Sequence, residues 1–101
     1  MNEIAKFVVF HTLLPPTLLS EGEPVAKAAK KYSTPEANWV STWNALDEQG
    51  NVTKLCSEWD AKDVESIRGV LDRVKLETPG VERFVFDGIY PLMKMDSEAY
   101  R

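Results

Sequence analysis

The sequence contains little of what anchors or cross-links several classes of small protein. Its 101 residues include one cysteine and one histidine. A single cysteine excludes an internal disulfide framework and a cysteine-rich zinc site. No apolar run approaches the roughly 18 residues of a membrane-spanning helix, and residues 1–6 lack the charged and apolar segments of a signal peptide. We therefore expect a cytoplasmic protein without a membrane partner.

Basic charge is also scarce, which argues against nucleic acid as a partner. Acidic residues outnumber basic ones 16 to 12, and the net charge of −4 opposes binding to phosphate backbones. RNA-binding domains stack bases on aromatic residues in a basic, glycine-marked strand, and residues 51–60 (NVTKLCSEWD) lack that pattern. Phosphate-binding glycine loops and nucleotide fingerprints are absent as well.

What the chain does contain is enough apolar material for one core. Hydrophobic residues make up 44% of the chain and aromatic residues 10%, a composition that excludes general disorder. At this length we expect a single domain over residues 1–101. Residues 96–101 follow the last periodic segment and are expected to form a flexible tail.

Segments of two periodicities alternate along the chain, and their order predicts the fold class. The pattern is β-α-β-β-α-β, typical of a ferredoxin-like α+β fold with a four-stranded antiparallel sheet and two helices on one face. Pro91 suits an edge strand, which favours the strand order 4-1-3-2. We expect strands at residues 6–14, 38–46, 52–59 and within 83–95, and helices at 24–32 and 64–74.

Three local signals make finer predictions. Pro15 and Pro16 should end the first strand, because proline cannot continue a β-ladder. Asp63 should cap the second helix, because its carboxylate can accept an unpaired backbone N–H. Gly69 inside that helix costs about 1 kcal/mol relative to alanine, which we expect a close approach to the sheet to explain.

Alternation along the strands predicts which side chains share a face. With a four-residue turn at 47–50, the face covered by the helices would carry Val8, Phe10, Val40, Leu55 and Trp59. A one-residue change in turn length would exchange the faces of the second strand. The open face would carry Phe7, Val9, His11, Trp39, Trp43, Lys54, Cys56 and Glu58.

An open face that mixes rings and charges predicts an interface. We expect two copies to stack these faces as a two-fold homodimer resembling a dimeric α/β barrel, with a cavity between them. His11 is the candidate ligand-binding, metal-binding or proton-transfer residue there. Alternatively, His11 is a hydrogen-bonded structural residue at a strand end, the tryptophans are core residues, and Cys56 is an inert buried thiol.

Several segments resemble a known family. They are FVVFHTLLPP at 7–16, NWVSTW at 38–43, CSEWDAKDVESI at 56–67 and GIYPLMKMD at 88–96. Together they are similar to a family of small ferredoxin-like proteins, one member of which is a nickel-responsive, nickel-binding bacterial protein. The resemblance implies a dimeric α+β sandwich that binds a metal or a small molecule, with His11 as a ligand and a divalent transition metal as the candidate cofactor.

The leading hypothesis is a non-enzymatic homodimer that binds a small ligand or a metal on the open sheet face. A second hypothesis is a cofactor-independent enzyme of the dimeric α/β-barrel type, a monooxygenase or isomerase with His11 as its base. A third is a purely structural or interaction protein whose open face is filled by the partner subunit. In the leading hypothesis His11 contacts the ligand, and the rest of the site consists of Trp39, Trp43, Lys54 and Glu58.

Overall fold

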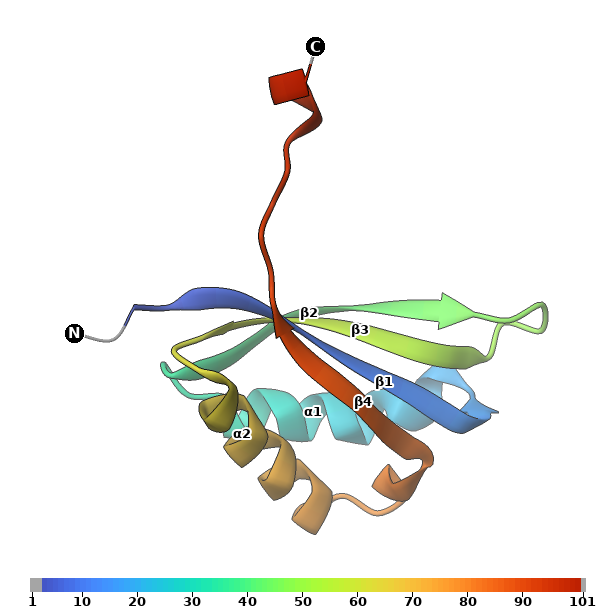
Figure 1. Cartoon of the computed structure of the whole chain (residues 1–101). Coiled ribbons are helices and arrows are strands. Elements are labelled where there is room, and N and C mark those ends of the chain that lie inside the picture. The colour runs from blue at the N-terminus through green and yellow to red at the C-terminus, as the bar shows by residue number, and fades with distance from the viewer. Residues whose placement is uncertain (1–2, 101) are drawn as a thin grey trace.

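The computed structural model describes residues 3–100 as a four-stranded antiparallel sheet with two helices below it (Figure 1). The sheet order β2-β3-β1-β4 matches the predicted order, and the α+β architecture is consistent with a ferredoxin-like fold. Neither α-helix in this range has the length and apolar character needed to cross a bilayer. The elements are β1 (Ala5–Thr17), α1 (Glu23–Tyr32), β2 (Ala37–Leu46), β3 (Val52–Ala61), α2 (Val64–Glu77) and β4 (Phe84–Pro91), with 3-10 turns η1 (Leu19–Gly22), η2 (Val81–Arg83) and η3 (Ser97–Tyr100).

The core lies between the sheet and α2. Ile67, Val70 and Val74 repeat on one face of α2 and are buried against the sheet. From the sheet, Trp59 and Val9 are almost completely buried in the same cluster. Helix α1 differs, because none of its residues is fully buried. The α1 side chains that pack against this cluster are only partly buried, namely Val25, Ala28, Ala29 and Tyr32.

The predicted faces of β1 are wrong. Phe7 pairs with Trp59 and His11 with Leu55, and directly paired residues share a face of the sheet. Phe7 and Val9 belong to the helix-covered core, so Val8 and Phe10 point to the open face. The prediction failed because residues 7–10 are all apolar, and an unbroken apolar run does not show which face is buried.

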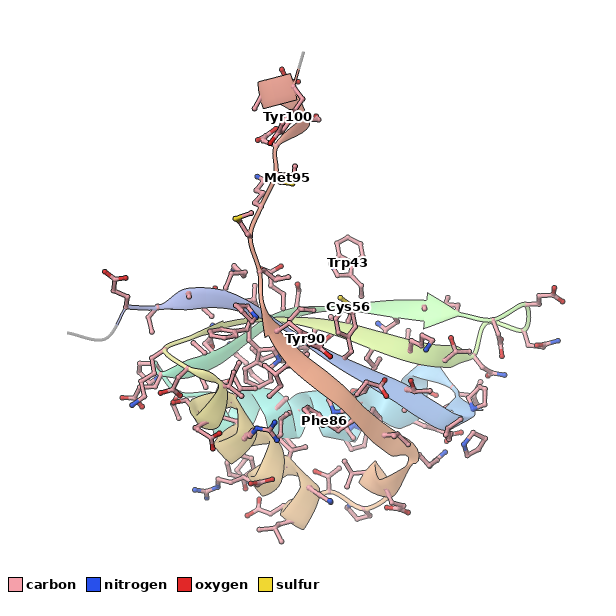
Figure 2. All side chains as sticks on the ribbon, in the orientation of Figure 1. Trp43, Cys56, Phe86, Tyr90, Met95 and Tyr100 are labelled. Carbon is pink, nitrogen blue, oxygen red and sulfur yellow. The ribbon has the colours of Figure 1, made fainter. Side chains whose placement is uncertain are left out.

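The two tryptophans of β2 were also predicted on one face, and a β-bulge separates them. Trp39 pairs with Trp59, yet Ser41 pairs with Glu58, so Val40 is an extra residue on β2. One extra residue reverses the alternation beyond it. Trp39 therefore faces the helices, whereas Trp43 pairs with Cys56 on the open face (Figure 2).

Pro15 and Pro16 do not end β1, contrary to the prediction. The ladder with β3 continues to the pair Thr17 and Val52, after a register shift that begins beyond Thr12. Residues 13–16 lie opposite Thr53 alone, so both prolines occupy an irregular stretch where the β1–β3 ladder is interrupted. Both prolines are exposed.

Helix α2 confirms one local prediction and contradicts another. The Asp63 carboxylate accepts the Ser66 N–H at 2.8 Å, which is the predicted cap. Gly69, however, is exposed, and a Cβ added there would meet nothing within 4 Å. No close approach to the sheet explains this glycine.

Replacing Gly69 with alanine should stabilise the protein. Gly69→Ala fills open space in a helix interior and restricts the unfolded chain, so the free energy of unfolding should rise by about 1 kcal/mol. Urea denaturation followed by circular dichroism measures the change. Gly80 is the matched control because its φ is +83°, so Gly80→Ala should lower stability. A loss of stability in Gly69→Ala would show that the helix packs more closely there.

Candidate functional site

A large cavity lies between the sheet and the two helices. Its volume is about 1230 Å³, above the roughly 300–1000 Å³ of ordinary ligand pockets. The floor comes from the helix-covered face of the sheet, and both helices and the turns η1 and η2 contribute walls. Its lining includes His11, Trp39, Thr42, Ser57, Trp59 and Phe86 from the strands, and Ala29, Arg68 and Leu71 from the helices.

The cavity exists because α1 does not pack closely on the sheet. Val25, Ala26 and Ala29 line it from α1 and are only partly buried, although α1 is an amphipathic helix. Two of these side chains are alanines, which occupy little of the space between helix and sheet. Apolar walls that do not meet lose the dispersion contacts of a filled core, so an apolar molecule in this space would stabilise the fold.

His11 forms part of the cavity wall and packs against an aromatic ring. Its imidazole meets the ring of Phe86 edge to face, with centroids 5.7 Å apart at 71°. Figure 2 shows Phe86 on the helix side of the sheet, and the Arg68 guanidinium lies 5.3 Å from the same ring. Burial lowers the pKa of His11, while the nearby Asp87 carboxylate partly opposes this shift. His11 is therefore neutral at pH 7 and able to accept a proton or a hydrogen bond.

A short chain of polar groups crosses the sheet side of the cavity. Trp39 Nε1 donates to Thr42 Oγ1 at 2.8 Å, and that hydroxyl lies 2.9 Å from Ser57 Oγ. Trp59 is different, because within residues 3–100 its Nε1 is a buried donor that meets no acceptor. An unsatisfied buried donor costs about 1–3 kcal/mol, so the ring carries an unused capacity to donate.

The predicted site residues divide between the two faces of the sheet. His11 and Trp39 line the cavity under the helices. Trp43, Lys54 and Glu58 lie on the opposite, open face, where Trp43 is 74% exposed. The structure thus brings two of the five together and separates the other three from them.

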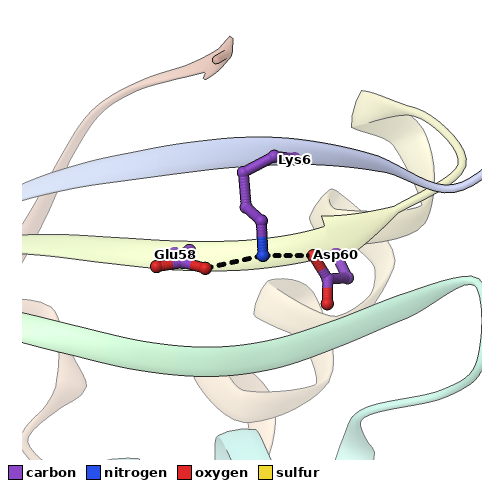
Figure 3. Close-up of polar contacts among 3 residues, drawn as sticks. All are labelled: Lys6, Glu58 and Asp60. Atoms are coloured by element: carbon purple, nitrogen blue, oxygen red, sulfur yellow. Dashed lines mark hydrogen bonds and ion pairs between the residues drawn. The ribbon is translucent and has the colours of Figure 1, made fainter. Parts of the chain in front are cut away.

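Glu58 is engaged in an ion-pair cluster on the open face (Figure 3). Lys6 Nζ lies 2.6 Å from a carboxylate oxygen of Glu58 and 2.6 Å from one of Asp60. The hydrogen bonds that Lys6 donates, first to Asp60 and then to Glu58, raise the pKa of Lys6. One cation between two anions leaves this part of the open face negatively charged.

Sequence reasoning missed several cavity residues. Trp59 and Leu55 were placed on the helix-covered face, yet no cavity was predicted there. Phe86 and Arg68 were not singled out at all. The only available signal was the pair of small residues Ala26 and Ala29 on the inward side of α1, and small residues are equally typical of close packing.

The metal hypothesis stays a prediction. Among residues 3–100, no group of three or more histidine, cysteine, aspartate or glutamate side chains is arranged to hold a metal ion. His11 and Glu58 face opposite sides of the sheet, so they do not form a common site. A metal bound at His11 would need its other ligands from solvent or from a second molecule.

Comparisons with protein-family models, curated proteins and solved structures found no match for this chain. The resemblance to a nickel-binding ferredoxin-like family therefore also stays a prediction. The candidate site has to be judged from its own geometry.

The burial of His11 predicts how stability depends on pH. Its pKa is lower in the folded chain than the usual 6.5 of the unfolded chain, so the unfolded chain binds the proton more tightly. The contribution of neutral His11 to the free energy of unfolding is fully present above pH 6.5 and is lost as the pH falls below that value. On acidification to pH 5.5, the melting temperature should therefore fall less for His11→Gln than for wild type.

A direct measurement of the same quantity is available because the chain has one histidine. Proton NMR of the imidazole should give a single titrating resonance with a midpoint below 6.5. A midpoint at or above that value would contradict the buried, neutral His11 described here.

Proposed function

We propose that this protein binds a small, mostly apolar molecule in the cavity between its sheet and its helices. The observation that carries the proposal is an apolar cavity of about 1230 Å³ with the only histidine of the chain in its wall. Pockets that combine apolar and aromatic walls with a few convergent polar groups are typical of ligand-binding proteins.

The polar groups of the wall indicate the class of ligand. Neutral His11 and the Thr42 and Ser57 hydroxyls offer hydrogen bonds. The charged residues of the lining are all exposed, so the wall holds no buried full charge; they are Glu23, Arg68, Asp72, Lys75 and Glu82. A full charge on the ligand would lose its hydration without a buried counter-charge. The cavity therefore suits an aromatic or alicyclic molecule with one carbonyl, hydroxyl or weakly acidic group.

This proposal moves the ligand site away from the open face on which it was expected. The open face keeps its expected role as the interface of a homodimer, and that homodimer is the second part of the proposal. Its support is the exposure of apolar side chains there, with Trp43 at 74%, Tyr90 at 53% and Phe10 at 38%. Covering them with a second copy removes this area from water.

Narrowing the cavity should weaken ligand binding without unfolding the protein. We choose the uncharged dye N-phenyl-1-naphthylamine as the probe, because it carries no full charge and its fluorescence rises in apolar surroundings. Ala29→Phe places a ring inside the cavity, so it should weaken dye binding by about tenfold or more, equivalent to about 1.4 kcal/mol. Fluorescence titration measures the affinity, and circular dichroism confirms that the variant is folded.

Two control variants separate the cavity from other apolar surfaces. Leu76→Phe adds the same ring on α2, at a residue that is 86% exposed, and should leave dye affinity unchanged. Trp43→Ser removes the most exposed ring of the open face and should also leave it unchanged. If Trp43→Ser lost the binding and Ala29→Phe kept it, the site would lie on the open face and the proposal would be wrong.

A second candidate function is acid–base catalysis on the bound molecule. The observation in its favour is the neutral imidazole of His11 at the cavity wall, since a general base must be unprotonated at the working pH. A bound phenol or quinol would lie beside this base. Fold alone does not assign the reaction.

Oxygen consumption with a panel of hydroquinones, measured against pH, tests the enzymatic alternative. The rate should fall on acidification as His11 becomes protonated, and His11→Gln should lose about 100-fold or more in rate, the usual contribution of a general base. Equal rates for wild type and His11→Gln would remove His11 as the base. Ligand binding would still stand, because it is measured separately.

A further inference from the structure

The C-terminal segment 92–100 leaves the domain on the open side of the sheet. Figure 1 shows it rising from the end of β4, away from the helices, as an extended trace that ends in the turn η3. Within residues 3–100, the last backbone hydrogen bond that joins the segment to the sheet is donated by the Leu92 N–H to the Lys6 carbonyl, at 2.9 Å. Trp43 and Cys56 lie on the same side of the sheet (Figure 2).

The residues of this segment are poorly suited to a free tail. Met93 is 87% exposed, Met95 68% and Tyr100 69%, and Leu92 at the base is 47% exposed. Its end is folded by local bonds, with the Ala99 N–H donated to the Asp96 carbonyl at 3.1 Å. Flexible thioethers and an aromatic ring are typical of binding surfaces. The segment is an arm that does not lie on its own sheet, and its apolar side chains are interspersed with the charged Lys94, Asp96 and Glu98.

We propose that the arm, residues 92–100, clasps a second copy of this chain seated on the open sheet face. The inference rests on the homodimer proposed above and adds the arm as the element that holds it. Under two-fold symmetry each arm reaches the other copy in the same way, so the two contacts form together.

The length of the arm fits this arrangement. Two face-packed sheets lie about 10 Å apart, and an extended residue rises about 3.3 Å. Met95 is three residues beyond Leu92, so it reaches the level of the second sheet. The turn η3 (Ser97–Tyr100) then lies beside or beyond that sheet. Because β4 is an edge strand, the arm rises at the rim and leaves the face free for the partner.

The area of the sheet indicates why an arm is needed. Four strands of 8–13 residues, at about 4.8 Å between strands and 3.3 Å per residue, cover roughly 500–650 Å² of face. Two such faces bury roughly 1000–1300 Å², close to the lower limit of about 1000 Å² for a specific interface. Two arms that carry Met93, Met95 and Tyr100 bring the total into the ordinary range.

The first experiment compares dimer dissociation constants by analytical ultracentrifugation. Wild type should be a dimer at micromolar concentration, and Trp43→Glu should be a monomer, because it places a charge where the most exposed ring of the open face lies. A chain that ends at Leu92 keeps the last bond to Lys6 and should dimerise at least about tenfold more weakly. Leu76→Ser, at an exposed apolar residue outside the interface, is the control and should behave as wild type.

These outcomes separate the arm from the homodimer. If wild type is a monomer, the homodimer fails and the arm fails with it. If wild type is a dimer and the chain ending at Leu92 dimerises equally tightly, only the arm is wrong. Trp43→Glu that remains dimeric would place the interface elsewhere on the molecule.

A second experiment asks which chain the arm touches. A spin label at Tyr100→Cys, in a chain with Cys56→Ser, is mixed with isotope-labelled chains that carry no spin label. Signals of the labelled chains should broaden at the rim of the open face, because the arm contacts the partner. A second sample carries the spin label and the isotope label on the same chain, diluted with unlabelled chains. Broadening in that second sample alone would show an arm folded back on its own sheet and would overturn the proposal.

Discussion

The pairing of Phe7 with Trp59 across β1 and β3 is the constraint on which the rest of the structure depends. These two central strands have the longest uninterrupted ladder of the sheet, and their register decides which of their side chains face the helices. It directs Phe7, Val9 and Trp59 into the core with α2. It also assigns His11 to the cavity, and Lys6, Glu58 and Asp60 to the open face. A shift of one residue would exchange these roles together.

The two helices cover the sheet unequally, and the cavity follows from that difference. Helix α2 buries three branched residues, Ile67, Val70 and Val74, whereas α1 presents alanines and buries none of its residues completely. The sheet therefore has one half filled by protein and another half with space between its walls. A small domain with a single core has little stability to spare, so this space is a notable departure from close packing.

The architecture was predictable from the sequence because its signals are local. Turn residues at 47–50, the Thr78-Pro79-Gly80 break and the helical spacing of Val64, Ile67 and Val74 predict the order of elements. Pro91 favours an edge position, and β4 lies at the edge. Asp63 caps its helix as its side-chain chemistry indicates.

The candidate site was not predictable in the same way. His11 could be singled out because it is the only histidine, and Trp39 because it belongs to an aromatic strand. The face on which they lie depends on pairing between distant segments, and the uniform apolar run 7–10 carries no alternation to reveal it. The cavity depends on how far α1 stands from the sheet, which is a property of packing among several elements rather than of any one segment.

The extra residue at Val40 makes the two halves of β2 face opposite ways. Because β2 has one more residue than β3 between these positions, Trp39 and Trp43 lie on opposite faces of the sheet. A substitution at one of the two tryptophans therefore leaves the side chains of the opposite face in place. Deleting a single residue at the bulge would instead reverse the alternation in the rest of β2, so its helix-facing and open-face side chains would change places. An insertion or deletion within β2 is therefore far more disruptive than a substitution of one of its side chains.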